Sequence, residues 1–441
     1  MSAQPDRDIV RDLRDTVLRA MAETSQLRRE RGEPPLTRHQ ESEYARHVIL
    51  DALSRRAETD VSQGRDGLSP AEEAALVDQV LALMFGMGKL DALLKDERVE
   101  GIDVNGADTV WVTYTGGRVV PADPVADNDD ELIRLVQHLA AYEGLSERAF
   151  DRAHPLLSLR LQDGSRLVAT MGVSVRPSLS IRRNRLPNLS LDDLVERGTL
   201  DEHLRSFLGA VVRARCNIMI AGATAAGKTT LLRALAAELP EQERIITVER
   251  TLELELHKGR HRNVVALEER PPNLQGAGGI KLSDLARQAL GMNPSRVIVG
   301  EVSGPEIVVM LQAMTQGNDG SLSTIHARSP QHVGDRIHTY AATADERLPA
   351  DAIDRLIAGG LDFVVFVQAR PIESATGSDD LLTRRLVTHV TEITDGGGRP
   401  AYSNIFASTS SDTVAQPTGT ATTRISRLMR AGYSPGAWSH A

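Results

Sequence analysis

The chain has 441 residues, a net charge of −9, and a composition of 41% hydrophobic and 25% charged residues. This length exceeds one ordinary hydrophobic core, so two or three domains are expected, and the acidic balance argues against a general nucleic-acid binder. The single cysteine, Cys216, excludes a disulfide framework and a cysteine-built zinc site and suits a reducing cytoplasm. No apolar run is long enough to span a bilayer, and no signal-peptide core follows Met1.

Residues 1–70 are predicted to form a helical extension that ends in a linker. Apolar residues recur at helical spacing between residues 5 and 32, and a second helix is expected from about Arg38 to Arg56. The polar stretch from Glu58 to Ser69 contains two glycines, which favours a linker. The sequence leaves open whether these helices pack on the next domain or on a partner.

A small α+β domain is predicted over residues 71–185. It begins with a helix that Ser69 caps and that runs toward Gly86, after which the apolar period changes to two. Further helices are expected at Leu90 to Leu94 and Asp130 to Tyr142, and strands at Val99 to Val104, Val110 to Tyr114, Arg118 to Val120, Leu156 to Leu161 and Arg166 to Thr170. A linker from Arg182 to Asn188 would close this domain.

An α/β domain with a mainly parallel sheet is predicted over residues 190–441, because apolar strands alternate there with helices. Strands are expected at Ile218 to Ala221, Arg244 to Val248, Arg296 to Val299, Ser323 to Ile325, Phe363 to Val367 and Leu386 to Ile393. Helices are expected at Leu191 to Val195, Glu202 to Ala214, Thr230 to Leu239, Asp284 to Leu290 with Ser283 as N-cap, and Pro305 to Thr315. The Ser/Thr-rich residues 407–423 lack periodicity and are predicted to be a flexible surface segment.

A phosphate-binding motif organises this domain. The pattern G-x-x-x-x-G-K-[ST] lies between a predicted strand and a predicted helix, a setting in which a chance match is rare. Its members are Gly222, Ala223, Thr224, Ala225, Ala226, Gly227, Lys228 and Thr229, followed by Thr230. Lys228 can reach the β- and γ-phosphates, and the Thr229 hydroxyl is placed for Mg²⁺. We therefore predict that the chain binds a nucleoside triphosphate.

Three acids that follow apolar strands are candidates for cleaving the terminal phosphate. Glu301 ends the strand that begins at Arg296, where it could polarise the attacking water or hold Mg²⁺ through water. Glu249 and Glu253 follow another strand and could share this work. The alternative for Glu301, and for one of the other two acids, is an ordinary solvated carboxylate.

A histidine and a group of arginines could contact the phosphates. His326 follows the strand predicted at Ser323 to Ile325 and could sense the γ-phosphate by a hydrogen bond, although a lone histidine is usually structural. The arginines that precede the nucleotide domain are Arg160, Arg166, Arg182, Arg183 and Arg185. They could form a charge clamp from the same or a neighbouring subunit, or simply face solvent.

Several segments, in this order along the chain, resemble the traffic ATPases of type II and type IV secretion systems. They are Gly86 to Leu90, Val99 to Asn105, Arg160 to Arg166, Pro177 to Arg182, Gly222 to Thr230, Val248 to Leu254, Val299 to Val302 and Gly317 to His326. The resemblance covers about residues 76 to 410 and is greatest to the Tad/Flp pilus-assembly branch, which is CpaF-like.

This resemblance implies a RecA-like ATPase domain that uses ATP and Mg²⁺. It also implies a homo-hexameric ring at the cytoplasmic, inner face of the membrane, which works with inner-membrane platform proteins. The acidic charge balance, in turn, disfavours direct contact with nucleic acid. Glu253 and Glu301 would be catalytic, and His326 would be the sensor. The nucleotide would also be contacted by Arg160, Arg166 and Arg182.

Three residues depart from the family pattern. Arg250 stands where aspartate is usual, Ser303 replaces a common arginine, and Asn318 replaces a histidine. Losing an acid and gaining a cation near the metal could weaken Mg²⁺ binding, or could compensate for the missing arginine. We therefore predict an altered, slow ATPase rather than a dead one, because Lys228, Thr229, Glu253 and Glu301 remain. The alternatives are the ATPase of a conjugative DNA-transfer system and a nucleotide-binding ring scaffold with little hydrolysis. A small-molecule P-loop kinase is disfavoured by the lack of an acceptor-binding lid signature.

Overall fold

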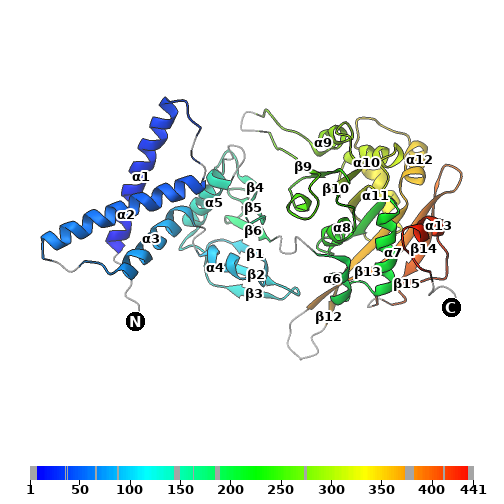
Figure 1. Cartoon of the computed structure of the whole chain (residues 1–441), viewed down its shortest axis with the longest axis horizontal. Coiled ribbons are helices and arrows are strands. Elements are labelled where there is room, and N and C mark those ends of the chain that lie inside the picture. The colour runs from blue at the N-terminus through cyan, green and yellow to red at the C-terminus, as the bar shows by residue number, and fades with distance from the viewer. Residues whose placement is uncertain are drawn as a thin grey trace. The chain divides into compact units, whose positions relative to one another are not determined.

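The computed structural model describes residues 7–34, 36, 38–64, 67–86, 89–143, 149–161, 163–183, 189–272, 276–372, 382–410 and 413–435 (Figure 1). The chain forms two compact units. The first ends at Ile181 but omits two short segments, Thr113–Val119 and Arg160–Arg166, which belong to the second unit together with the chain from Arg182 onward. The predicted linker ran from Arg182 to Asn188; Arg182 instead ends a strand, and residues 184–188, with Arg185, lie outside the described residues.

The first three helices share one core. They are α1 (Arg7–Glu30), α2 (Arg38–Ser62) and α3 (Pro70–Phe85), and their centre is formed by the fully buried Val17, Ile49 and Val80. We expected α3 to belong with the sheet that follows, and a linker to begin at residue 58. Instead α3 packs on α1 and α2, and α2 continues to Ser62, where the Thr59 hydroxyl donates to the Arg55 carbonyl oxygen and the Ser62 hydroxyl to the Thr59 carbonyl oxygen.

The predicted start of α3 is found at a capping box. The Ser69 backbone N–H donates to Glu72 Oε2 at 2.8 Å, and the Glu72 N–H donates back to Ser69 Oγ at 3.3 Å. This reciprocal pair satisfies two amides that the first helical turn leaves without partners.

A six-stranded sheet and two helices follow. The strands are β1 (Val99–Asn105), β2 (Val110–Tyr114), β3 (Val119–Ala122), β4 (Leu156–Arg160), β5 (Arg166–Thr170) and β6 (Ser178–Arg182), and the helices are α4 (Leu90–Lys95) and α5 (Asp129–Glu143). The strand order is β3-β2-β1-β6-β5-β4. Along β4 and β6 buried and less buried residues alternate, as expected for strands with one covered face. Strand β6 was not predicted, because residues 177–182 resemble the end of the family's N-terminal domain.

The second unit is built on a nine-stranded sheet with the order β15-β14-β13-β12-β7-β11-β10-β8-β9. The strands are β7 (Ile218–Gly222), β8 (Ile245–Glu249), β9 (Val264–Glu268), β10 (Arg296–Val302), β11 (Leu322–His326), β12 (Phe363–Ile372), β13 (Leu382–Asp395), β14 (Pro400–Ala407) and β15 (Gln416–Pro417). The six strands from β12 to β9 in this order run parallel, whereas β13, β14 and β15 add in antiparallel fashion.

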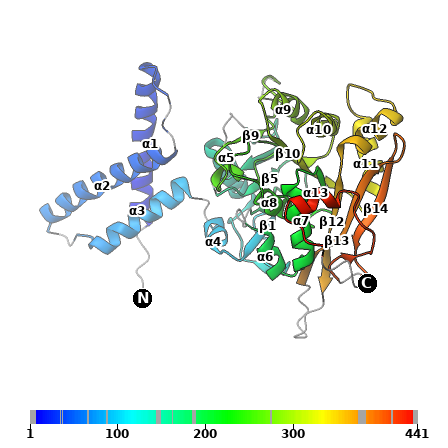
Figure 2. The ribbon, with the colours of Figure 1, turned by 45° about the vertical axis from the view of Figure 1, so that its right-hand side comes forward.

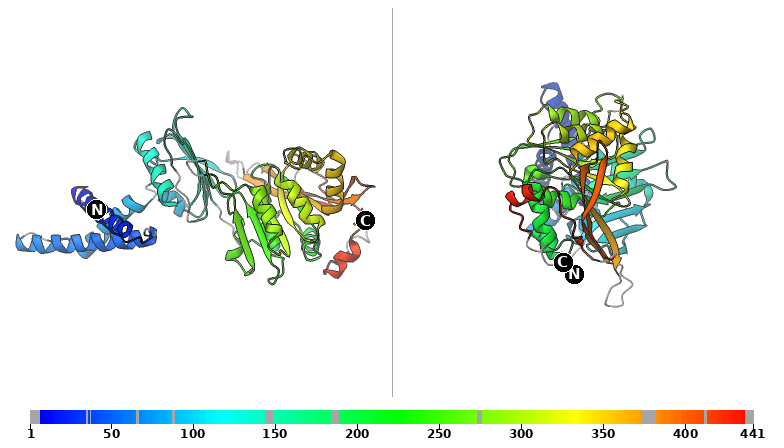
Figure 3. Two further views of the ribbon diagram at one scale, coloured as in Figure 1. Left: turned by 90° about the horizontal axis from the view of Figure 1, so that it is seen from above. Right: turned by 90° about the vertical axis from the view of Figure 1, so that its right-hand side faces the viewer.

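Helices cover both faces of this sheet (Figures 2 and 3). One face packs against α6 (Leu191–Glu196), α7 (Glu202–Arg213), α8 (Lys228–Ala236) and α13 (Ile425–Arg430), and the other against α9 (Leu282–Leu290), α10 (Glu306–Thr315), α11 (His332–Ala341) and α12 (Ala350–Gly360). A short 3₁₀ turn lies at Leu256–Lys258. Burial on both faces explains why the parallel strands read as continuous apolar runs. Cys216 is fully buried, and burial raises the pKa of its thiol to about 12, so it is an inert core residue.

Some predicted boundaries differ from the structure. α8 begins at Lys228, two residues earlier than predicted, because the loop feeds directly into its first turn. α9 begins at Leu282, so Ser283 lies inside the helix and is not its N-cap. Strand β9 was not predicted.

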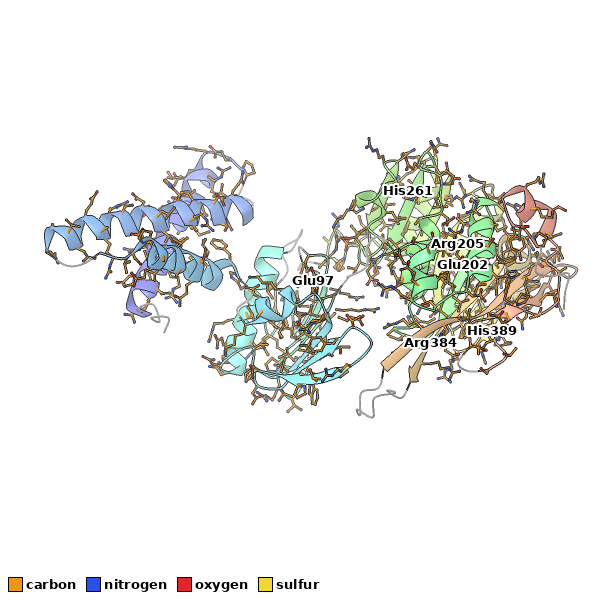
Figure 4. All side chains as sticks on the ribbon, turned by 60° about the horizontal axis from the view of Figure 1, so that its bottom comes forward. Glu97, Glu202, Arg205, His261, Arg384 and His389 are labelled. Carbon is orange, nitrogen blue, oxygen red and sulfur yellow. The ribbon has the colours of Figure 1, made fainter. Side chains whose placement is uncertain are left out.

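At the C-terminal end of α8, the buried His261 places Nε2 at 3.0 Å from the Ala236 carbonyl oxygen (Figure 4).

The Ser/Thr-rich segment 407–423, predicted to be a flexible surface segment, has two buried residues among those that the structure describes. Ala415 is fully buried. The Thr422 hydroxyl donates to Glu392 Oε1 at 2.9 Å, and the Thr423 N–H donates to Glu392 Oε2 at 3.0 Å. Hydroxyl groups here satisfy a buried carboxylate, although most described residues of the segment are exposed or partly exposed. Among the helices of the described ranges, none is both long and apolar enough to cross a membrane.

Candidate active site

The segment predicted to bind phosphate joins β7 to α8. β7 lies between two parallel neighbours, β11 and β12, and all its residues are buried. A Cβ at Gly222 would collide with the Val367 carbonyl oxygen of β12, and Gly227 has a φ of +98°. Both positions therefore need glycine. The amides of the first turn of α8 have no acceptor within the helix, so they are available to an anion.

Ala225 adopts a left-handed conformation with a φ of +59°. A residue with a Cβ loses roughly 1 kcal/mol or more in this conformation. Arg385 Nε donates to the Ala225 carbonyl oxygen at 3.3 Å and supports this turn from β13. Alanine therefore makes the loop stiffer than glycine would, and it leaves the loop amides in place.

Lys228 is a buried ammonium at the start of α8, with 6% of its surface exposed. Its Nζ donates to the Ala223 carbonyl oxygen at 2.9 Å and lies 3.1 Å from His326 Nδ1. Burial lowers the pKa of Lys228 to about 8, an effect that Glu301 opposes and Arg182 reinforces. Neither hydrogen-bonded partner carries a negative charge, so a phosphate would meet a cation that has little other compensation.

Nucleotide affinity is expected to fall as the pH rises above about 8. Below that pH, Lys228 is charged in the free protein and needs no proton to bind a triphosphate. Above it, binding must take up a proton, so affinity is lost by up to about tenfold per pH unit. Titration of a non-hydrolysable ATP analogue between pH 7 and pH 9.5 measures this. An affinity that does not change over this range would contradict the expectation.

A bulge in β10 presents Glu301. β10 pairs with β11 as Val299 with Ser323 and then Val302 with Ile325, so β10 has one extra residue between these pairs. The Thr324 hydroxyl donates to the Gly300 carbonyl oxygen at 2.8 Å and holds the bulge. Bulges redirect a side chain away from the regular alternation of a strand. The Glu301 side chain is accordingly 45% exposed, although residues 296–299 are buried.

His326 links the two predicted phosphate-site residues. It lies opposite Gly222 in the β11–β7 pairing. Its Nε2 is 3.1 Å from Glu301 Oε1, while its Nδ1 faces Lys228. An ammonium only donates and a carboxylate only accepts, so a neutral imidazole protonated on Nε2 satisfies both contacts. Burial, followed by the Lys228 cation, lowers the pKa of His326, which favours this neutral form.

Glu249 and Glu253 have different surroundings. Glu249 is 2% exposed, and its Oε2 accepts the backbone N–H groups of Glu253 at 2.7 Å and Leu254 at 2.8 Å. Its Oε1 accepts the Thr247 hydroxyl at 2.9 Å. Burial raises the pKa of Glu249 to about 7. Through these hydrogen bonds, Glu249 positions the backbone of the segment that carries Glu253.

If Glu249 acts by positioning this backbone segment, two substitutions of Glu249 should give different results. Glu249→Ala leaves buried amides without an acceptor, and we expect it to lower the free energy of unfolding by about 2 kcal/mol or more. Glu249→Gln keeps one oxygen acceptor and removes a buried charge, so stability and phosphate release should stay close to wild type at pH 8. Urea denaturation and a phosphate-release assay measure the two effects. A large loss of turnover with intact folding in Glu249→Gln would instead assign Glu249 a direct catalytic role.

One pocket of about 110 Å³ brings several predicted residues together. Its lining consists of Arg166, Thr229, Glu249, Arg250, Thr251, Glu253, Gly300, Glu301 and Ser303. Thr251 and Gly300 line the pocket without having been predicted as site residues. Their only signal was their position beside the acids at the ends of β8 and β10. Lys228 and His326 are tied to the pocket through Glu301, whereas Ala223, Thr224, Ala226 and Thr230 do not line it.

The predicted arginines have different surroundings. Arg166 lines the pocket, and its Nε is buried without a hydrogen-bond partner among the described residues. Arg160 forms an ion pair with the buried Glu255. Arg182 acts on Lys228 electrostatically. Arg183 approaches Asp163 at 4.0 Å. Only Arg166 of this set lines the pocket in the described structure.

The three departures from the family pattern also separate. Arg250 and Ser303 both line the pocket and hydrogen-bond to each other, with Nη2 at 2.9 Å from Oγ. Asn318 instead donates through Nδ2 to the Pro294 carbonyl oxygen at 3.0 Å, in a turn before β11. Asn318 therefore has a structural contact, whereas the other two residues can affect the pocket.

The donor set suits a triphosphate with Mg²⁺. Lys228 and the α8 amides supply donors for phosphate, and Thr229 and Glu301 supply oxygen atoms on the pocket side. No group of three or more His, Cys, Asp or Glu side chains in the described ranges could hold a metal alone. Mg²⁺ generally keeps several waters and takes few protein ligands beside substrate phosphates.

Comparisons with known proteins agree with this architecture. The family model described as "Type II/IV secretion system protein" matches residues 122–422. The chain is 31% identical over 331 residues to the type IV secretion system protein PtlH of Bordetella pertussis, covering 68% of this chain and 94% of the relative. It is 34% identical over 271 residues to a Mycobacterium tuberculosis protein whose name links it to conjugal transfer, covering 59% and 74%.

A solved structure shares the fold. The X-ray structure of the Legionella pneumophila ATPase DotB matches with a TM-score of 0.50 and 17% identity, over 72% of this chain and 82% of that chain. The predicted fold class is thereby confirmed: a RecA-like α/β domain with a mainly parallel sheet, preceded by an α+β part and N-terminal helices. The family match spans more than half of the chain, and the chain belongs to the type II/IV secretion system protein family.

Proposed function

We propose that the chain is an ATPase that powers pilus assembly or protein secretion across the cell envelope. The observation that supports this most strongly is the pocket in which Thr229, Glu253 and Glu301 meet beside the buried Lys228. Family membership and the names of the relatives, a secretion-system protein and an ATPase, point the same way. Within the family we propose the Tad/Flp, CpaF-like branch, on the motifs named above.

The residues of the pocket divide the work of hydrolysis in this proposal. Lys228 and the α8 amides bind the β- and γ-phosphates, and Glu301 orients the attacking water, with Glu253 beside it. His326 contacts both Glu301 and Lys228, fixes their positions relative to each other, and responds to the terminal phosphate. Thr229, with Glu301 through water, would hold Mg²⁺, which neutralises phosphate charge. Arg160, Arg166 and Arg182 are proposed nucleotide contacts, and Arg166 is the best placed in the described pocket.

We further propose that six copies form a ring on the inner face of the membrane, where they act on inner-membrane platform proteins. Nucleic acid is not proposed as a direct partner, because the net charge is −9. Size-exclusion chromatography with light scattering, with and without ATP, tests the ring. A chain that remains monomeric with bound nucleotide would contradict it.

Phosphate release by the purified full chain tests the enzymatic proposal. Wild type should release phosphate from ATP, whereas Lys228→Ala should lose both binding and release. A wild type that binds ATP and yet releases phosphate no faster than Lys228→Ala would replace the motor by a ring scaffold with little hydrolysis. Arg250 in the pocket supports that second candidate, because a positive charge there repels Mg²⁺.

A conjugative DNA-transfer ATPase is the other candidate, and the name of the Mycobacterium tuberculosis relative favours it. Genes beside this one distinguish the two: prepilin and prepilin-peptidase genes indicate a pilus, and relaxase genes indicate conjugation.

A further inference from the structure

Arg250 is held at the edge of the pocket by two contacts from neighbouring strands. Its Nε donates to Glu269 Oε2 at 3.1 Å, and its Nη2 donates to Ser303 Oγ at 2.9 Å. Ser303 is itself fixed, because its backbone N–H donates to Glu306 Oε1 at 2.6 Å and Glu306 is buried. The position of the guanidinium is therefore determined by side chains that follow β9 and β10 as well as by its own segment after β8.

The sheet explains why these residues meet. β8 lies between β9 and β10, and all three strands are parallel. Their carboxyl ends therefore share one edge of the sheet, which is where ligands bind in such folds. Arg250, Glu269 and Ser303 each follow one of these strands within two residues. The same edge carries Glu253 and Glu301.

An ordinary surface ion pair would explain only part of this arrangement. Exposed pairs contribute little to stability, and the Arg250 side chain is 54% exposed. The second contact, to Ser303, does not neutralise charge, and it directs the guanidinium to a residue that lines the pocket. The described hydrogen bonds use Nε and Nη2, so Nη1 can donate to another acceptor. Arginine is suited to this, because its planar fork binds phosphate oxygens in pairs.

We propose that Arg250 contacts the terminal phosphate of the bound triphosphate and makes the site prefer triphosphate over diphosphate. Thr229 and Glu301 line the same pocket, which places Arg250 on the side where the terminal phosphate would lie. A diphosphate lacks the group that Arg250 reaches, so its affinity would not depend on this residue. Ser303 acts as a positioning residue for the guanidinium. The proposal rests on the proposed ATP site and deepens it.

Equilibrium binding tests this without turnover. The dissociation constants of a non-hydrolysable ATP analogue and of ADP, both with Mg²⁺, are measured for wild type, Arg250→Ala and Ser303→Ala. Arg250→Ala should lose roughly tenfold or more in affinity for the analogue, the size expected for a hydrogen bond to a charged group, and little for ADP. Ser303→Ala should lose less, in the same direction. Arg287→Ala is the matched control. Arg287, on α9, is 58% exposed and forms an ion pair with Glu346 at 2.9 Å.

The outcomes separate this inference from the proposed function. If the ratio of the two affinities is the same in Arg250→Ala and wild type, whether or not both affinities fall, the inference is wrong while the proposed ATP site stands. If Glu269→Gln changes the ratio as much as Arg250→Ala, the guanidinium still acts and the ion pair positions it. If wild type binds neither nucleotide, both proposals fail. An unchanged ratio in Arg287→Ala is required for support.

Discussion

Glu301→Gln should slow phosphate release by roughly 100-fold or more while nucleotide still binds. The β10 bulge, held by Thr324, projects Glu301 into the pocket, and His326 fixes one of its oxygen atoms at 3.1 Å. Glutamine keeps the shape of the side chain but cannot accept a proton or carry the charge that orients the water. Binding depends mainly on Lys228 and the loop amides, so it should remain.

The matched control for this prediction is Glu346→Gln. Glu346 also accepts a hydrogen bond from an arginine, at 2.9 Å, but it does not line the pocket. It should leave phosphate release unchanged. Phosphate release is measured under single-turnover conditions, and binding with a fluorescent analogue. Turnover in Glu301→Gln within a few-fold of wild type would exclude Glu301 as the residue that orients the water.

Arg296→Ala should lower the free energy of unfolding by about 3–5 kcal/mol. Arg296 begins β10 with no exposed surface. Its Nη1 donates to the carbonyl oxygens of Val212 and Gly320, both at 3.1 Å, and its Nη2 donates to Glu243 Oε1 at 3.1 Å. Alanine would leave a cavity, two buried carbonyl groups and a carboxylate with one fewer partner.

Urea denaturation of the full chain measures this loss as a shift of the midpoint. Arg355→Ala is the control, because Arg355 is an exposed arginine paired with Asp351 within α12, and such pairs contribute about 0.5 kcal/mol or less. A shift in Arg296→Ala as small as that of the control would show that the buried network contributes nothing to stability. Since β10 also carries Glu301, partial loss of phosphate release in Arg296→Ala is expected to follow the loss of folded protein.

The acids and arginines of the pocket show how a tertiary contact can change an interpretation. Glu249 and Glu253 look equivalent in sequence, yet the Glu249 carboxylate accepts three hydrogen bonds, one of them from the backbone N–H of Glu253. Arg250 and Ser303 look like two independent losses in the family pattern, yet they are hydrogen-bonded partners. These contacts join residues that are up to 53 positions apart, which no local pattern reports.

Local patterns were sufficient for the phosphate loop and for most of the sheet. A loop between a buried strand and a helix is encoded by residues next to each other, and its glycines are required by the local backbone and by the close passage of β12. The α/β class and the place of Glu301 at a strand end could be read from the chain alone for the same reason.

Other features were decided only when distant segments came together. The β10 bulge depends on its register with β11, the core of α1 to α3 on contacts between helices, and the burial of Thr422 on a hydrogen bond to the Glu392 carboxylate in β13. Pairing register and the satisfaction of buried polar groups are properties of the assembled sheet. Composition and periodicity describe one segment at a time, and so they could name the residues of this site but not which of them would touch.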